Sequence, residues 1–168
     1  YPLKPGDEII VTNHGYNACN NAAAFIAKER GAIIKEATLA YPVQSSEQVL
    51  AAIESVIGPK TKLAIIDHIT SPTAVITPIQ DIVELLEQKG IDTLVDGAHA
   101  PGQIPIDLQT LGAAYYTGNC HKWLCTPKGS AFLFVREDKH DEVRPLAISH
   151  GANAPTGERS FFRNEFDW

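Results

Sequence analysis

The sequence predicts an α/β fold in which a mostly parallel sheet is sandwiched by helices. Strand and helix patterns alternate along the chain, the connections between them are short, and polar residues follow several of the predicted strands. Alternation of this kind is typical of parallel strands joined by helical crossovers. The chain has 168 residues, 44% hydrophobic and 20% charged, which is enough for one domain with a buried core.

The first elements are read from hydrophobic periodicity. Glu8–Thr12 is short and apolar, as expected of a strand. The Ala-rich segment Asn17–Arg30 predicts an amphipathic helix, and Gly31 marks its end. Residues 32–37 predict a second strand.

The middle of the chain continues the alternation. Ser45-Ser46-Glu47-Gln48 predicts a capped helix to about residue 57, with either serine offering its hydroxyl to the free amides. Residues 62–67 form a continuous apolar strand, and Pro78 opens a helix that reaches residue 89. Asp92–Asp96 is again short and strand-like.

Two further strands, residues 113–117 and Ala131–Val135, flank a loop with several polar side chains. In open parallel sheets, ligands bind beyond the carboxyl ends of the strands. The sequence therefore predicts a site at one sheet edge, because polar residues lie at or just after the strand ends: His14, His68, Asp96, Asn119, His121 and Lys122.

Composition narrows the possible partners and compartments. A net charge of -6 and a pI near 5.4 leave no basic stripe for nucleic acid, so a small-molecule substrate is expected. No apolar run is long enough for a membrane span, and the first residues lack the apolar stretch of a signal peptide. Three cysteines fit no disulfide framework, which favours reduced thiols and a cytoplasmic location. Residue 1 is not Met, and both ends look cut from a longer protein.

Lys122 and Asp96 have the chemistry that pyridoxal 5'-phosphate needs from a protein. The cofactor is held as an imine on a lysine amine, which must be neutral when it attacks. Lysine has a reference pKa of about 10.4, so the site must desolvate the amine or place positive charge near it. A buried carboxylate beside the ring nitrogen keeps that nitrogen protonated. Read alone, Lys122 is a surface charge and Asp96 the cap of an Asp-Gly turn.

Two motifs in this order carry a family resemblance: Asp96-Gly97-Ala98-His99-Ala100 and Asn119-Cys120-His121-Lys122-Trp123. The chain resembles the class V aminotransferase family, and within it proteins described as isopenicillin N epimerase or cysteine desulfurase-like. The resemblance covers essentially the whole chain. It implies that residues 1–168 are the large pyridoxal phosphate-binding domain of a fold type I enzyme, truncated at both ends, with the C-terminal small domain absent. Relatives of this kind are usually homodimers.

The resemblance also implies roles for individual residues. Lys122 would bind the cofactor and move protons, and Asp96 would pair with the ring nitrogen. His99 would bond the phenolic oxygen of the ring, where relatives often have glutamine, and His14 would stack on the ring. Asn119 and His121 would contact the phosphate. Ser71 lies where cysteine desulfurases commonly carry asparagine, and it is a further candidate contact.

The expected function is an enzyme acting on an amino acid through an external aldimine. Epimerisation, desulfuration and transamination all remain open, because they differ only after a bond at the α-carbon breaks. The clamp for the substrate carboxylate is expected outside the chain.

Two other classes of function remain open. A metal-dependent hydrolase would use loop residues, although no metal-binding spacing is present. Its ligands would come from a set that overlaps the cofactor site: His14, His68, His99, Asp67 and Asp96. A catalytically inactive binding module is the other.

Overall fold

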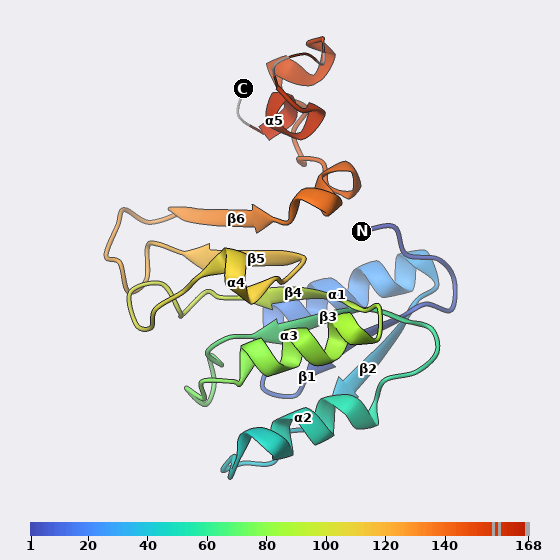
Figure 1. Ribbon diagram of the computed structural model, residues 1–168, viewed down its shortest axis with the longest axis vertical. Coiled ribbons are helices and arrows are strands. Elements are labelled where there is room, and N and C mark those ends of the chain that lie inside the picture. Colours follow the sequence, from blue (N-terminus) through green and yellow to red (C-terminus); the bar gives the residue numbers. More distant parts are fainter. Residues whose placement is uncertain (156, 158, 167–168) are drawn as a thin grey trace. The chain divides into compact units, whose positions relative to one another are not determined.

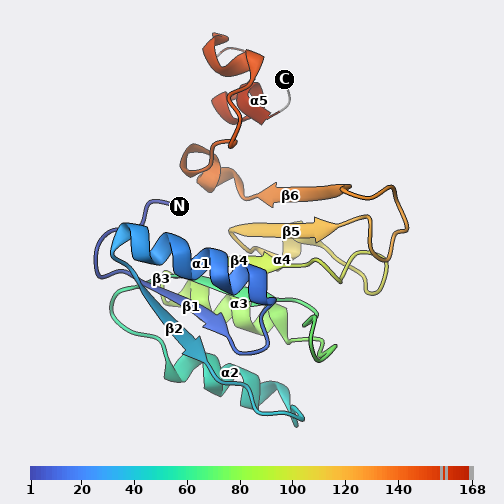
Figure 2. The same cartoon turned by 180° about the vertical axis from the view of Figure 1, so that it is seen from behind.

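The structure is a computed structural model that describes residues 1–155, 157 and 159–166 (Figures 1 and 2). It divides into two compact units. One comprises Leu3–Phe134, and the other comprises Tyr1–Pro2 with Val135–Trp168. The larger unit contains the parallel strands and all the site residues predicted from the sequence.

The larger unit is built on a six-stranded sheet in the order β2-β1-β3-β4-β5-β6. The neighbouring pairs from β2 through to β5 are all parallel. Figure 1 draws the β5 and β6 arrows in opposite directions. The predicted fold class, a mostly parallel sheet, is therefore confirmed. The strands are β1 (Glu8–Thr12), β2 (Ile33–Ala37), β3 (Thr61–Asp67), β4 (Asp92–Asp96), β5 (Tyr115–Asn119) and β6 (Ala131–Val135).

Helices cover both faces of this sheet. Figures 1 and 2 show α1 (Asn17–Arg30) on one face and α2 (Ser46–Ser55) and α3 (Ile79–Gln88) on the other. The largest buried cluster joins the sheet to α2 and α3, because these helices turn an apolar stripe inward. Its fully buried members include Ile10, Ile53, Ala64, Ile82, Leu86 and Val95.

The helix ends follow the predicted local chemistry. Gly31 ends α1 in the left-handed conformation, with φ of 69°, which glycine adopts at little cost. Ser45 caps α2, and its hydroxyl accepts a hydrogen bond from the Gln48 amide at 3.3 Å. Of the two serines that the sequence offered, Ser45 is therefore the cap.

One predicted strand is shifted. The strand expected at residues 113–117 is β5, Tyr115–Asn119, so Asn119 is the last strand residue and does not lie in the loop. Ala113 and Ala114 are apolar, as strand residues often are, and they are buried. They lie between α4 (Leu108–Leu111) and β5, however, and not in the strand. The helix α4 was not predicted, because four residues are too few to show a period.

The smaller unit contains short helical segments that the sequence did not predict. They are two 3-10 helices, Glu137–Glu142 and His150–Asn153, and the helix α5 (Phe161–Phe166). Aromatic stacking links them, because the His140 and Phe162 ring centroids lie 4.1 Å apart. Residues 156, 158, 167 and 168 lie outside the described part of the chain.

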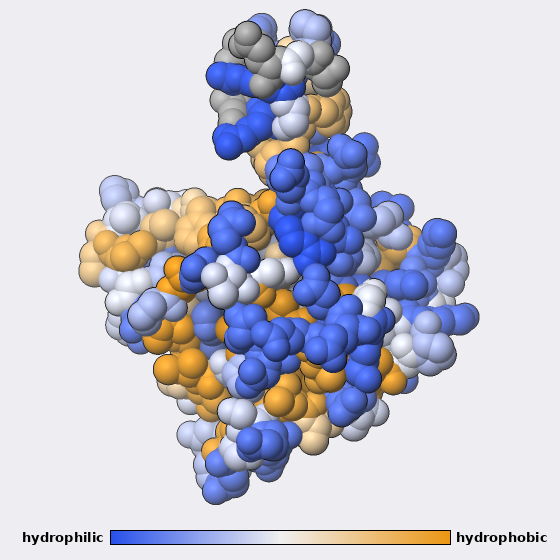
Figure 3. Space-filling model, viewed as in Figure 1, coloured by the Kyte–Doolittle hydropathy of each residue, from blue (hydrophilic) through white to orange (hydrophobic). Residues whose placement is uncertain are grey.

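The surface mixes polar and apolar side chains. On the face seen in Figure 3, apolar side chains reach the surface between polar ones over α2 and α3. Among the more exposed apolar residues are Tyr41, at 68%, and Ile76, at 59%. Within the described ranges, no helix combines the length and the apolar character that a membrane crossing requires.

Candidate active site

Two carboxylates lie side by side at the carboxyl edge of the sheet. Asp67 ends β3, Asp96 ends β4, and the two residues are in register on adjacent parallel strands. Side chains in register on neighbouring strands point to the same face. Both are buried, with exposures of 5% and 7%. The sheet therefore concentrates negative charge where a ligand is expected.

Asp96 is held in place by two donors. The Ala98 amide donates to Oδ1 at 3.0 Å, and the Cys19 thiol donates to Oδ2 at 3.4 Å. Cys19 is in the first turn of α1, so this helix reaches the end of β4. Burial, and then the charge of Asp96, raise the pKa of the Cys19 thiol to about 11. Cys19 is thus a neutral donor to the carboxylate and not a nucleophile near neutral pH.

Asp67 has a different electrostatic environment. Burial, followed by the charge of Asp96, raises the pKa of Asp67 to about 7. Hydrogen bonds from the backbone amides of Tyr16 and Ser71 and the charge of Lys122 oppose this shift. Asp67 therefore bonds both the start of α1 and the loop after β3. Its carboxyl group changes charge near neutral pH.

Lys122 lies in a hydrogen-bonded chain with two rings. Its Nζ is 3.0 Å from His99 Nε2, and Trp123 Nε1 donates to His99 Nδ1 at 3.2 Å. Burial, and then the charge of Lys122, lower the pKa of His99. The Lys122 Nζ is also 6.0 Å from the centroid of the Tyr16 ring, at the outer limit of a cation-π contact.

A second chain of hydrogen bonds orients His14, which is 5% exposed. Thr73 Oγ1 lies 3.0 Å from His14 Nδ1 and 2.7 Å from Thr70 Oγ1. Both threonines belong to the loop that follows β3, and Thr70 is buried. His14 is therefore fixed from the β3 side although it follows β1.

The remaining predicted contacts are less closely joined. His121 donates from Nδ1 to the Ser130 carbonyl at 2.9 Å, which leaves Nε2 for another partner. Asn119 is half-buried at the end of β5. Ser71 is exposed, and its backbone amide, not its side chain, bonds Asp67. The structure thus pairs Lys122 with His99 directly and sets the other candidates at strand ends or on loops of the same unit.

His68 belongs to the packing of the unit. Its Nδ1 lies 2.9 Å from the hydroxyl of Tyr116, a fully buried side chain, and burial lowers the pKa of His68. Among the described residues, no three His, Cys, Asp or Glu side chains are grouped so as to hold a metal ion. This arrangement offers no support for the hydrolase alternative.

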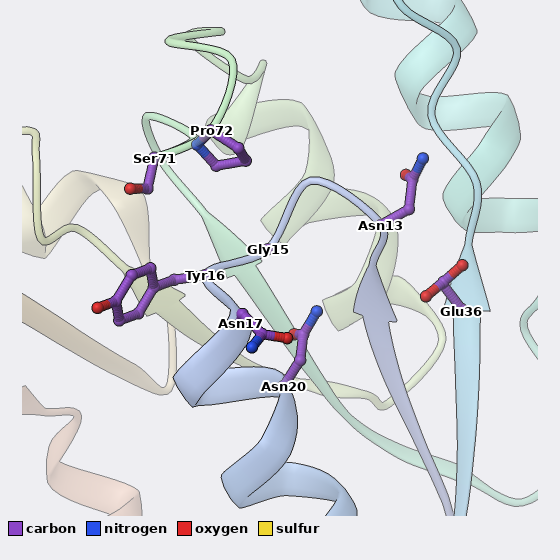
Figure 4. A pocket seen from close by; sticks show the side chains of 8 residues that line it. All are labelled: Asn13, Gly15, Tyr16, Asn17, Asn20, Glu36, Ser71 and Pro72. Carbon is purple, nitrogen blue, oxygen red and sulfur yellow. The ribbon is translucent and has the colours of Figure 1, made fainter.

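A polar pocket of about 490 Å³ adjoins these residues (Figure 4). The figure shows Tyr16 and Ser71 on one side and Asn13 and Glu36 on the other. Asn17, Asn20, Gly15 and Pro72 complete the lining. The only charged side chain in this lining is the Glu36 carboxylate.

These groups fit the cofactor chemistry expected from the sequence. An amine, an imidazole in contact with it and a buried carboxylate are supplied by separate segments of one unit. Lys122 and Asp96 both act electrostatically on Cys19, Asp67 and His99, which places the two groups in one neighbourhood.

Some residues of the site were not assigned to it from the sequence. Tyr16, Cys19, Thr73 and Trp123 were not singled out, and Asp67 was considered only as a metal ligand. The sequence could have pointed to Trp123, because this residue follows Lys122 directly. The others meet the site only through the packing of α1 and the loop after β3.

Comparison with known proteins gives a consistent family. The family described as Aminotransferase class-V matches residues 1–161. An isopenicillin N epimerase of Amycolatopsis lactamdurans is 35% identical over 168 residues, covering 98% of this chain and 42% of the relative. An L-cysteine desulfhydrase of Arabidopsis thaliana is 29% identical over 156 residues, covering 88% of this chain and 34% of the relative.

A solved structure agrees with these sequence matches. The cystine C-S lyase C-DES, in complex with its reaction product cysteine persulfide, superposes with a TM-score of 0.84 and 26% identity. The match covers 99% of this chain and 46% of that chain. The chain therefore spans less than half the length of each of these relatives.

Proposed function

The chain belongs to the class V aminotransferase family, and on that basis we propose that it is the cofactor-binding part of a pyridoxal 5'-phosphate enzyme that acts on an amino acid. The observation that carries the proposal is the contact of 3.0 Å between Lys122 Nζ and His99 Nε2, in the same unit as the buried Asp96. A solved relative with a PLP cofactor, described as C-DES mutant K223A with glycine linked to that cofactor, supports it at 27% identity.

Each residue has a defined task in this proposal. Lys122 would hold the cofactor through its amine and then carry a proton to or from the substrate's α-carbon. Asp96 would accept a hydrogen bond from the ring nitrogen and keep it protonated, because its negative charge favours the cationic form. His14 would pack against the ring, and its hydrogen bond to Thr73 fixes its plane. When bound, the cofactor supplies an electron sink for the α-carbon.

The phosphate contacts are proposed for Asn119 and His121. The bond from His121 Nδ1 to the Ser130 carbonyl fixes that ring, so Nε2 is the nitrogen available to an anion. Ser71 is proposed as a weaker contact, because its hydroxyl is exposed on the loop after β3.

The test uses the full chain mixed with pyridoxal 5'-phosphate. We expect absorbance typical of a lysine-bound cofactor, and borohydride reduction followed by peptide mass spectrometry should locate the cofactor on Lys122. The Lys122→Ala variant should lose both signals. Lys128→Ala, a change of an exposed lysine in the same loop, should keep them. Equal labelling of several lysines without specific absorbance would refute the proposal.

The reaction branch needs its own assay. The relatives include an epimerase and an L-cysteine desulfhydrase. Both kinds of reaction can proceed through loss of the substrate's α-proton to a cofactor that acts as an electron sink. Exchange of the α-proton in heavy water, without net product, would favour epimerisation. Sulfide release from cysteine would favour desulfuration, and formation of a keto acid without sulfide would favour transamination. A loaded chain that does none of these would support the inactive binding module.

We also propose that the protein works as a homodimer. Exposed apolar side chains such as Phe25, at 62%, and Tyr41 are available for an interface on the larger unit. Light scattering of the chain after size-exclusion chromatography should give twice the mass of 18.2 kDa. A mass of 18.2 kDa at every concentration would contradict this proposal.

A further inference from the structure

His99 has a different neighbour at each ring nitrogen. Trp123 Nε1 reaches Nδ1 at 3.2 Å, and Lys122 Nζ reaches Nε2 at 3.0 Å. An indole nitrogen can only donate a hydrogen bond. His99 Nδ1 must therefore accept, and it carries no proton while this contact is present.

The imidazole is also held in its neutral form. Burial disfavours a positive charge on the ring and lowers the pKa of His99. A neutral imidazole has one proton, and with Nδ1 accepting from the indole this proton must be on Nε2. The nitrogen that faces Lys122 is thus an N–H donor.

We propose that Trp123 is a positioning residue that fixes His99 in the Nε2–H tautomer, so that a hydrogen-bond donor faces the group that Lys122 binds. An Nε2–H can be shared with the lysine nitrogen only while the amine is neutral, and the neutral amine is the form that attacks an aldehyde. The importance of this donor for a cofactor oxygen rests on the proposed function. The tautomer itself does not.

Trp123 is suited to such a role because little else holds it there. Its side chain is 54% exposed, and its ring centroid lies 6.4 Å from that of His99 at a tilt of 54°. Removing the indole N–H while keeping an aromatic ring therefore alters the hydrogen bond more than the packing.

The first test measures the tautomer in the cofactor-free full chain. Nitrogen-15 NMR of the His99 ring should show a proton on Nε2, and Trp123→Phe should move the ring toward a mixture of both tautomers. A proton on Nδ1 in the unaltered chain would overturn the proposal. An unchanged spectrum in Trp123→Phe would overturn it as well.

The second test is a double-mutant cycle with pyridoxal 5'-phosphate as the ligand. A glutamine amide always offers an N–H, so His99→Gln removes the need for a fixed tautomer. Trp123→Phe should weaken cofactor binding about three- to tenfold when His99 is present, as expected for loss of one hydrogen bond. The same change should have less than a twofold effect in the His99→Gln chain.

The outcomes distinguish control of the tautomer by Trp123 from a packing role, and they distinguish this inference from the proposed function. An equal loss in both backgrounds would show that Trp123 acts by packing and would overturn the tautomer role. If His99→Gln does not fold, as judged by circular dichroism, the NMR result decides alone. A chain that binds no cofactor, yet shows the Nε2–H tautomer, would refute the proposed function and leave this inference standing.

Discussion

Asp67 and Asp96 are in-register neighbours on β3 and β4, and both carboxyl groups are almost fully buried. Two negative charges on adjacent buried side chains repel each other and are poorly solvated, so ionising both carboxyl groups costs free energy. Asp96 accepts the hydrogen bond from the Cys19 thiol, and the pKa of Asp67 is raised to about 7. Near neutral pH, the pair therefore sits where a small change in pH changes its total charge.

This relationship predicts a pH-dependent stability that Asp67→Asn removes. The pKa of Asp67 is about 7 in the folded protein, whereas the ordinary pKa of an aspartate is 3.8. Its stabilising contribution is fully present below about pH 4 and is lost as the pH rises through about 7, by roughly 1.4 kcal/mol per unit of pKa difference. The asparagine variant should gain stability relative to the unaltered chain over this window, as measured by urea unfolding.

Glu36→Gln is the matched control for this experiment. It removes one negative charge from an exposed side chain on β2, which β1 separates from β3 in the sheet. Its stability difference from the unaltered chain should be the same at pH 5 and pH 8. Parallel stability curves for the unaltered chain and Asp67→Asn would contradict the assigned pKa.

Cys19 should be the slow thiol toward iodoacetamide at pH 7.5. The pKa of Cys19 is about 11, against an ordinary value of 9.0, which leaves about a hundredfold less thiolate than an ordinary cysteine has. The exposed Cys125 should be alkylated first, and tryptic mass spectrometry can follow both sites. Asp96→Asn should accelerate Cys19, because it removes the charge that holds the proton. Equal rates at both cysteines would show that the thiol does not bond Asp96.

Gly97→Ala should destabilise the larger unit. A Cβ at this position would run into the Tyr116 ring, which is fully buried and bonded to His68. Overpacking of this kind costs about 1–3 kcal/mol of unfolding free energy. In a Tyr116→Ala background the same change should cost much less, because the obstructing ring is gone. Equal costs in the two backgrounds would mean that the ring is not the obstacle.

Much of the fold could be predicted because the signals are local. Alternating apolar runs located β1 to β4 within one residue at each end, and Gly31 and Ser45 marked helix ends through their own chemistry. The start of β5 was wrong because Ala113 and Ala114 are buried without being strand residues. The helical segments after β6 are only four to six residues long, too short for a hydrophobic period to predict them.

The site residues likewise divide into those that a sequence pattern could indicate and those that depend on long-range packing. Lys122 and Asp96 could be predicted because the carboxyl ends of parallel strands meet at one edge. The role of Cys19 could not, because it depends on how α1 packs against the end of β4, and no short-range pattern encodes that packing. The cofactor roles of all the predicted site residues stay predictions that the tests of cofactor binding must decide: Lys122, Asp96, His99, His14, Asn119, His121 and Ser71.

The Lys122 amine and the Asp96 carboxylate contact residues that are far away along the chain. His99 is 23 residues before Lys122, and Asp96 is bonded by Cys19 at a separation of 77 residues. A synthetic peptide that copies the lysine loop would therefore keep the sequence of the motif and lose these contacts. Any attempt to transplant this chemistry into another scaffold has to carry the parallel strands along with the loop.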